Sequence, residues 1–145
     1  MRIDKFEEIE AWQLGRQLTQ QVYRLTKKPR FAHDFGLTRQ IQEAAGSAMH
    51  NIAEGFDAET NLEFIRFLRY AKRSCSEVQS ELHVALDQEY ITRTEFETVY
   101  QHAARTRAAI RGFINYLTRY QATRRGVKPL NAEPLNLKTQ RQEKS

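Results

Sequence analysis

A regular apolar repeat between Thr60 and Leu86 constrains this chain more than any other feature of its sequence. The repeat steps alternately by four and three residues and comprises Phe64, Leu68, Ala71, Cys75, Val78, Leu82 and Ala85. Such a 3.5-residue repeat is typical of a helix that packs one seam against neighbouring helices. Thr60 and Glu63 have the spacing of a capping box at its start. Because an isolated helix of this length is marginal in water, the repeat predicts partner helices of similar length.

Three further helices are expected from the same kind of periodicity. They cover residues 7–28, residues 37–54 and a last stretch that ends near Gln121. Pro29 ends the first of them, since proline has no backbone N–H and disfavours helix in the residue before it. Short links favour antiparallel neighbours, so the sequence predicts an all-α fold, an antiparallel up-down-up-down four-helix bundle over residues 1–122. Two capping boxes compete for the start of the last helix, Thr92 with Glu95 and Thr94 with Glu97.

Residues 123–145 differ in composition from the rest of the chain. They carry six basic and two acidic residues, so +4 of the net charge of +5 lies in this segment and +1 is left for the body. Helical periodicity stops before the segment, and Gly126, Pro129 and Pro134 interrupt any regular element. We therefore expect a flexible, disordered basic C-terminal tail behind a nearly neutral bundle.

The helix expected over residues 7–28 is apolar on two sides. One side carries Ala11, Leu14, Leu18, Val22 and Leu25. Ile9, Trp12 and Tyr23 fall on nearly the opposite side. Every helix of a four-helix bundle is peripheral, so this second apolar side predicts contact with another subunit and hence a homo-oligomer. The alternative is that these are single exposed apolar residues, which are common at protein surfaces.

The motifs of common catalytic and metal-binding sites do not occur in the sequence. No Glu has a His three residues later, as a di-iron bundle requires, and glycine-rich phosphate loops, G-x-S-x-G and H-E-x-x-H are absent. His50 with Glu54 has the spacing of two metal ligands, but such a lone pair is more often solvated. Glu77 with Glu81 has the spacing for acid–base chemistry, but an ion pair with an arginine across the bundle is the usual explanation. We therefore expect no enzyme activity, no catalytic residue, no metal and no cofactor.

Cysteine usage and hydropathy favour a cytoplasmic location. Cys75 is the single cysteine, so an intrachain disulfide is excluded, and its place in the seam favours packing over reactivity. Residues 1–10 lack the apolar stretch of a secretory signal. No apolar run approaches the ~18 residues of a membrane span, so no membrane contact is expected.

Arginine-rich positions are the candidates for a nucleic-acid interface. Two helices contribute Arg66, Arg69, Lys72 and Arg73 and then Arg105, Arg107 and Arg111, and the tail adds Arg124, Arg125 and Lys128. Tyr70 lies within the first set, and arginine beside an aromatic ring suits phosphate contact combined with base stacking. The alternative is a solvated face on which Glu63 and Glu77 pair locally with the arginines.

Four segments resemble a known bacterial family. They are Phe6-Glu7-Glu8-Ile9-Glu10-Ala11-Trp12, Gly36-Leu37-Thr38-Arg39-Gln40-Ile41, Asn51-Ile52-Ala53-Glu54-Gly55 and Glu63-Phe64-Ile65-Arg66-Phe67-Leu68. Over residues 6 to about 120 the chain is similar to small four-helix bundle proteins encoded by intervening sequences of bacterial large-subunit ribosomal RNA genes. These proteins are often labelled ribosomal-protein-like, and they are distantly related to the accessory variability proteins of diversity-generating retroelements.

The resemblance implies a four-helix bundle, a ring of five subunits as in characterised relatives, and no established enzyme activity. Relatives in retroelements bind nucleic acid and a reverse transcriptase, so it also implies RNA or DNA, and a nucleic-acid enzyme, as partners. In one respect the chain departs from the family. Ala48-Met49-His50 and Gln42-Glu43 stand where a proline and a basic pair are usual, which weakens any basic surface on the helix over residues 37–54.

Structural roles are expected for Asn51, Glu54 and Gly55 in the most specific of these segments. Gly55 is a candidate for the left-handed residue that follows a helix. Glu54 would stand at the helix C-terminus, where a carboxylate is unfavourable to the helix dipole, so it should have a partner such as an arginine or the start of the next helix.

Together these features favour a non-enzymatic, oligomeric helical bundle that binds nucleic acid or a nucleoprotein through its basic surface and tail. The alternative is a protein-interaction scaffold that binds no nucleic acid. An enzyme is the least supported reading, since no catalytic constellation stands in the sequence.

Overall fold

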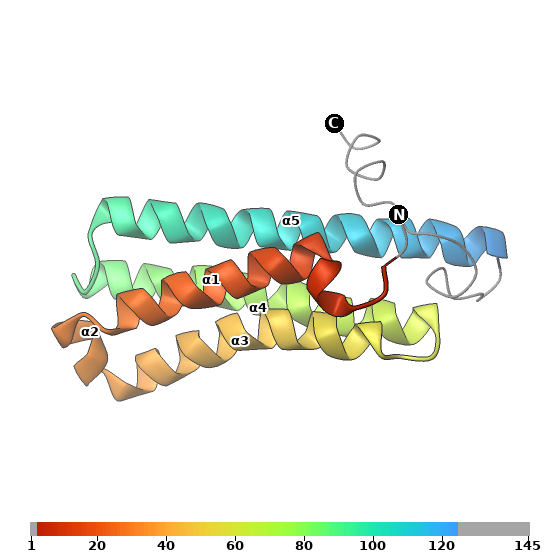
Figure 1. The fold of residues 1–145 in the computed structure, drawn as a ribbon. Coiled ribbons are helices and arrows are strands. Elements are labelled where there is room, and N and C mark those ends of the chain that lie inside the picture. The colour runs from red at the N-terminus through yellow and green to blue at the C-terminus, as the bar shows by residue number, and fades with distance from the viewer. Residues whose placement is uncertain (1–2, 125–145) are drawn as a thin grey trace.

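The computed structural model describes residues 3–124, and every regular element within them is helical (Figure 1). Four long helices are present: α1 (Glu10–Thr26), α3 (Phe35–Phe56), α4 (Asn61–Asp87) and α5 (Arg93–Arg124). Two short elements accompany them, the 3-10 turn η1 (Phe6–Glu8) and the helix α2 (Pro29–His33). The prediction of an all-α fold is confirmed for this part of the chain.

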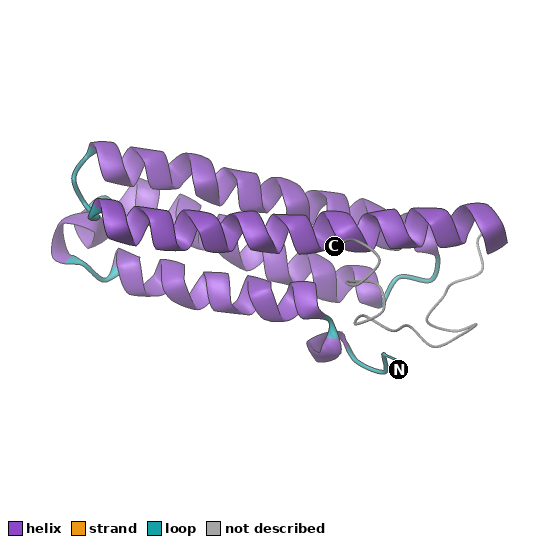
Figure 2. Cartoon of the chain, turned by 90° about the horizontal axis from the view of Figure 1, so that it is seen from above, coloured by secondary structure: helices purple, strands orange, loops and turns teal. Residues whose placement is uncertain are grey.

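The four long helices lie side by side along a common axis (Figures 1 and 2). Both α1 and α4 pack against α3 and α5, so these four contacts close the cross-section of the bundle. The contacts of α4 with its two neighbours are the most extensive. This agrees with the long apolar repeat that the sequence carries in α4.

Every position of that apolar repeat is buried. The core consists of two clusters: Phe64 and Leu68 belong to the one that also holds the start of α1 and the second half of α5. Val78 and Leu82 belong to the other, together with the second half of α1 and the first half of α5. Burying a large apolar side chain contributes about 1.5–3 kcal/mol, so this seam is a main source of the stability of the bundle.

The predicted caps form at the start of both α4 and α5. Thr60 Oγ1 accepts a hydrogen bond from the backbone N–H of Glu63 at 3.1 Å. At α5 the structure uses the first of the two competing boxes. Thr92 Oγ1 accepts from the N–H of Glu95 at 3.1 Å, and Glu95 Oε1 accepts from the N–H of Thr92 at 2.8 Å. This reciprocal pair satisfies two backbone donors that a helix start otherwise leaves free.

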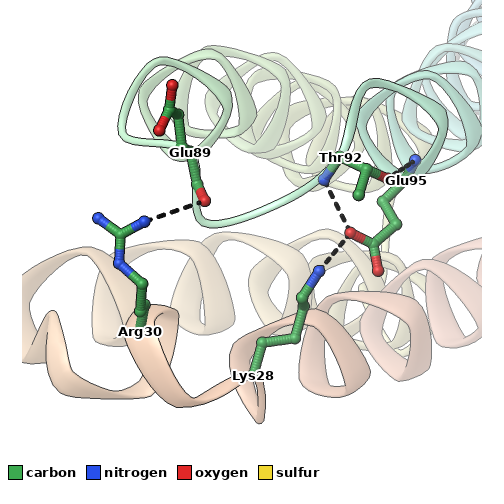
Figure 3. Close-up of polar contacts among 5 residues, drawn as sticks. All are labelled: Lys28, Arg30, Glu89, Thr92 and Glu95. Atoms are coloured by element: carbon green, nitrogen blue, oxygen red, sulfur yellow. Dashed lines mark hydrogen bonds and ion pairs between the residues drawn. The ribbon is translucent and has the colours of Figure 1, made fainter.

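The helix α2 occupies part of what the sequence predicts as a plain link. Pro29 stands in its first turn, where a missing N–H does no harm, and Phe31 is fully buried. Just before it, Lys28 forms an ion pair with the capping residue Glu95 (Figure 3). The hydrogen bond from Lys28 lowers the pKa of the Glu95 carboxyl group. The start of α2 is thereby fastened to the start of α5.

The turn after α4 contains the one positive φ angle among the described residues other than glycine. Glu89 has φ of 60°, its N–H donates to the carbonyl of Leu86, and the N–H of Tyr90 donates to the carbonyl of Ala85. This is the hydrogen-bond pattern of a Schellman turn, in which glycine usually takes the left-handed position. Arg30 donates to the carbonyl oxygen of Glu89 at 3.5 Å, while the carboxylate of Glu89 points away from it (Figure 3).

Two residues of the expected subunit interface lie in the core of the chain itself. Ile9 is fully buried and Trp12 is only 9% exposed, because the segment before α1 folds back over this side of the helix. The ring of Phe6 packs edge-to-face on Trp12 with 5.2 Å between centroids, and Ile3 is buried as well. The prediction of an outward apolar side is therefore wrong for Ile9 and Trp12. Tyr23 is 46% exposed.

The end of α5 lies beyond the point where periodicity stops in the sequence. The helix runs past Gln121 to Arg124, so the boundary expected at residue 122 is not a helix end. The rest of the expected tail, from residue 125 on, lies outside the described residues. No helix within residues 3–124 combines the length and apolar character needed to cross a membrane.

Candidate nucleic-acid interface

The outer side of the first half of α4 carries three exposed arginines, which we call the arginine face. Arg66, Arg69 and Arg73 are three and four residues apart, so they lie on one side of the helix. The side chain of Arg66 is 61% exposed. Phe64 and Leu68 in the same turns point into the core. The apolar seam buries one side of α4, and the three arginines therefore lie on the side of the helix that faces solvent.

Tyr70 lies in the middle of the arginine face and contacts two of its members. The guanidinium carbon of Arg66 lies 5.8 Å from the centroid of the Tyr70 ring, and that of Arg73 lies 5.1 Å from it. Arg66 Nε also donates a hydrogen bond to the Tyr70 hydroxyl at 3.1 Å. Both distances to the ring are in the range of cation–π contacts. The predicted neighbourhood of arginine and aromatic ring is therefore a set of direct contacts.

Local acidic pairing on the arginine face is weak. Glu63 Oε1 lies 3.8 Å from a terminal nitrogen of Arg66, with both side chains largely in solvent. Such an exposed pair contributes about 0–1 kcal/mol. Among the described side chains no ion pair joins Glu77 to an arginine. The positive charge of the face is thus left mostly uncompensated.

The arginines predicted on α5 do not form one set. Arg107 Nε donates to Ser76 Oγ on α4 at 3.0 Å, and Ser76 follows Arg73 by three residues, so Arg107 adjoins the end of the arginine face. Arg105 faces α1 instead. Its guanidinium donates to His102 Nδ1 at 2.8 Å, which leaves Nε2–H of the ring to donate to the carbonyl of Leu14 at 3.0 Å. Arg105 and His102 thus fasten α5 to α1.

The second half of α4 is acidic. Glu77 and Glu81 follow the arginine face, and Glu81 Oε2 is buried without a hydrogen-bond partner among the described residues. Burial, together with the charges of Glu77 and of Glu43 on α3, raises the pKa of Glu81 to about 7. The expected ion pair of these carboxylates with an arginine across the bundle is not found among the described side chains. The arginine face therefore ends where these acidic residues of α4 begin.

A chain of polar groups connects α3 to the backbone beneath Tyr70. Asn51 Nδ2 lies 2.9 Å from Ser47 Oγ, Ser47 Oγ lies 3.0 Å from Ser74 Oγ, and Ser74 Oγ lies 3.1 Å from the carbonyl oxygen of Tyr70. Each hydroxyl has a single proton to donate. The consistent assignment therefore runs from the Asn51 amide to Ser47, from Ser47 to Ser74, and from Ser74 to the carbonyl of Tyr70. These contacts are consistent with the structural role expected for Asn51.

Gly55 is needed for close packing and not for a turn. It lies inside α3, which continues to Phe56, and its backbone is not left-handed, so the predicted C-terminal role is wrong. A Cβ atom at this position would lie 2.7 Å from Cδ1 of Phe64 and 3.0 Å from Cβ of Phe67. The missing side chain lets the first turns of α4 approach α3. Phe67 in turn packs edge-on against Tyr70, with 6.2 Å between centroids.

Sequence reasoning missed Ser47, Ser74 and Phe67. Their roles depend on contacts between α3 and α4, and the run of small residues Ala44-Ala45-Gly46-Ser47-Ala48 is the one sequence signal of such close approach. Glu54 is exposed, and no hydrogen bond or ion pair of its side chain is found among the described residues, so the expected partner is missing. Arg125, Lys128 and the side chain of Arg124 lie outside the described part of the chain.

Neither the buried thiol of Cys75 nor the buried imidazole of His102 offers a reactive group. Burial raises the pKa of the Cys75 thiol to about 12, so the thiol stays protonated and serves packing. Burial also lowers the pKa of His102, whose two ring nitrogens are already engaged by Arg105 and Leu14. Within residues 3–124 no group of three or more His, Cys, Asp or Glu side chains is placed to hold a metal ion.

Comparison with solved structures shows the fold in a second protein. A protein of unknown function from the S23 ribosomal protein family of Bacteroides thetaiotaomicron superposes with a TM-score of 0.68 at 22% identity, over 72% of this chain and 97% of that chain. At this identity the likeness concerns the fold alone. No curated protein matches the chain.

Comparison with protein families agrees with the resemblance seen in the four sequence segments. The model of the 23S rRNA-intervening sequence protein family matches residues 7–112, which begin within η1 and include α1 to α4, most of α5 and the whole arginine face. The chain therefore belongs to the 23S rRNA-intervening sequence protein family.

Proposed function

We propose that this chain is a non-enzymatic helical-bundle protein that binds nucleic acid through the arginine face of α4, supplemented by Arg107 and by the basic residues from Arg124 onward. One observation carries the proposal: three arginines stand on one exposed side of α4, and two of them contact the same tyrosine ring. Guanidinium groups bind phosphate through paired N–H donors. Ordered, uncompensated guanidinium groups on a helix suit the backbone of a nucleic acid.

The proposal also includes self-assembly in the cytoplasm. The short connections of the bundle support an up-down-up-down order of its helices, and family resemblance implies a pentamer. In a ring of identical subunits each arginine face and each basic tail would be repeated. Repetition raises the avidity for a long polyanion without any new contact. Binding of an enzyme that acts on nucleic acid would be a further role of such a particle.

The test is a charge-neutralising triple variant with a matched control. Arg66→Gln, Arg69→Gln and Arg73→Gln are combined in one protein, and Arg24→Gln, Arg39→Gln and Arg93→Gln, three exposed arginines elsewhere on the bundle, in the other. Fluorescence anisotropy with a short labelled RNA is measured over a series of salt concentrations. Single-stranded binding changes by about −0.7 in log affinity per log salt for each neutralised phosphate, so the first variant should flatten the slope by about 2.

The control should keep the wild-type slope, although it has lost the same net charge. Equal slopes in the two variants would show that the arginine face is not the binding surface. Absence of any RNA binding by the wild-type protein at low salt would refute the proposed function as a whole.

A protein-interaction scaffold is the second candidate function, favoured by one feature at the other end of the bundle. Phe35 is 76% exposed and borders a surface depression of about 590 Å³ that Arg30, His33 and Tyr90 also line. Aromatic residues and arginine are enriched at protein docking surfaces. If the wild-type protein binds no RNA, that result would favour this second function.

A further inference from the structure

The ring of Tyr70 is already engaged within the chain. Arg66 stands one turn before it on α4 and Arg73 nearly one turn after it, so the two guanidinium groups flank the ring along the helix. The hydroxyl accepts from Arg66 Nε, and Phe67 packs edge-on at an interplanar angle of 89°. Stacking of a nucleobase on this ring would therefore compete with contacts that Tyr70 already makes within the chain.

The engaged ring changes what the arginines can do. An arginine side chain loses much rotamer freedom when it binds a phosphate, and contact with the ring removes part of that freedom beforehand. In Arg66 the ring hydroxyl engages only Nε, and the Glu63 carboxylate lies 3.8 Å from one terminal nitrogen, beyond hydrogen-bond distance, so the terminal N–H groups stay available for a phosphate fork. Arg69, which lies between the pair on the same exposed side, adds a third cation.

The position of Tyr70 is itself set from beneath by α3. Its carbonyl is held by Ser74, which contacts Ser47 and through it Asn51. The ring edge is held by Phe67, which fits against α3 because Gly55 has no side chain. Asn51 and Gly55 begin and end the segment Asn51-Ile52-Ala53-Glu54-Gly55. This segment of α3 therefore packs beneath the arginine face of α4.

We infer that Tyr70 is a positioning residue that orders Arg66 and Arg73 for the phosphate backbone, and that the arginine face binds polyphosphate chains without contact to their bases. This inference rests on the proposed function and narrows its ligand class. The sequence alone favoured base stacking on Tyr70, and the engaged ring reverses that interpretation. Strands of any base composition, and strands without bases, should bind alike.

Binding by full-length variants to three labelled strands of equal length tests this inference. The strands are oligo(A), oligo(U) and an abasic oligonucleotide with the same number of phosphates. The variants are Tyr70→Leu, which removes ring and hydroxyl, and Tyr70→Phe, which keeps the ring. Tyr100→Leu, at a partly buried tyrosine on α5 that belongs to neither the arginine face nor the expected subunit interface, is the matched control. Circular dichroism confirms that each variant keeps its helices.

Wild-type protein should bind all three strands within about threefold, and Tyr70→Leu should weaken each by a similar factor of about five, because the Arg66 and Arg73 side chains must then be ordered on binding. Tyr70→Phe should keep affinity within about twofold, since both ring contacts remain. A loss confined to oligo(A) and oligo(U) would mean that Tyr70 stacks on bases, which overturns the inference but not the proposed function. An unchanged affinity of Tyr70→Leu for all strands would overturn it as well.

Arginine side-chain NMR gives a readout that needs no ligand. The Nε–H of Arg66 should be protected from exchange in the wild type and lose that protection in Tyr70→Phe, because its acceptor is gone. Arg24 is exposed, and among the described residues no cation–π contact joins it to a tyrosine, so it is the internal reference. Equal exchange of the two Nε–H groups in the wild type would show that Tyr70 does not hold Arg66.

Discussion

Gly55 and Gly46 lie on the same helix, yet a methyl group would meet different surroundings at each. At Gly55 it would come within 2.7 Å of an aromatic carbon of Phe64, closer than atoms in proteins pack. At Gly46 the nearest atom is 3.6 Å away, on the exposed side chain of His50. One position requires glycine because of a neighbouring helix, and the other does not.

This difference predicts opposite effects of the same substitution. Gly55→Ala should lower the free energy of unfolding by about 1–3 kcal/mol, because overpacking displaces the start of α4. Gly46→Ala should raise it by about 0.5–1 kcal/mol, since alanine in a helix interior loses less backbone entropy on folding. Thermal denaturation followed by circular dichroism measures both. If the melting temperature of Gly55→Ala equals or exceeds that of the wild type, α3 and α4 do not approach each other as closely at Gly55 as described.

Residue roles of this kind were only partly predictable. The sequence pattern indicates a structural role for Gly55, but it predicts a helix end, because glycine after a helix commonly adopts the left-handed conformation. The actual reason is a contact with Phe64 and Phe67, which depends on how two helices meet. The prediction that Glu54 has a partner also rested on a helix end at this residue. The helix ends later than predicted, and the Glu54 carboxylate stays in solvent.

At the scale of elements, α4 combines a uniform apolar seam with an outer side whose charge changes sign. Its first half carries the arginine face, and its second half carries Glu77 and Glu81. A helix with this pattern presents a basic surface without a large net charge on the whole bundle. The near-neutral charge of residues 1–122 therefore does not argue against a local polyanion site.

Glu81 should make stability depend on pH. Its pKa is raised from 4.5 to about 7, so the folded state binds a proton that the unfolded state releases between these values. The contribution of Glu81 is then fully present below about pH 4.5 and is lost as pH rises through about 7. Glu81→Gln should stabilise the protein at pH 8 by about 1 kcal/mol, after allowance for solvent screening of a half-buried group.

Denaturant unfolding at pH 5 and pH 8 measures this effect, with Glu97→Gln at an exposed position of α5 as the control. His102 acts in the opposite sense, because its lowered pKa gives a contribution that is present above 6.5 and is lost on acidification. A gain for Glu81→Gln that is equal at both pH values would contradict the raised pKa.

The elements themselves were largely predictable because their patterns are local. The repeat of α4, the cap at Thr92 and the break before Pro29 all follow from residue spacing and backbone chemistry. The helix α2 was missed, since so short an element has no periodicity to detect and owes its place to the buried ring of Phe31. The arginine face was predictable from helical spacing, whereas the contacts that order it were not.

For the whole molecule, the outstanding prediction is its assembly state. Size-exclusion chromatography with light scattering should give several times the chain mass of 17.1 kDa, most simply five times if the family resemblance extends to assembly. With Ile9 and Trp12 inside the core, Tyr23 is the member of the expected interface that remains exposed, so Tyr23→Ser should shift the mass downward. A wild-type mass of one chain would contradict self-assembly.

The folded-back segment before α1 also gives the molecule an optical probe. Trp12 is the single tryptophan of the chain, and Phe6 and the guanidinium group of Arg16 cover its ring, the latter at 5.9 Å. Its fluorescence therefore reports on this one end of the bundle, while circular dichroism reports on all helices together. A shift of the emission without loss of helix content would reveal that the N-terminal segment detaches before the bundle unfolds.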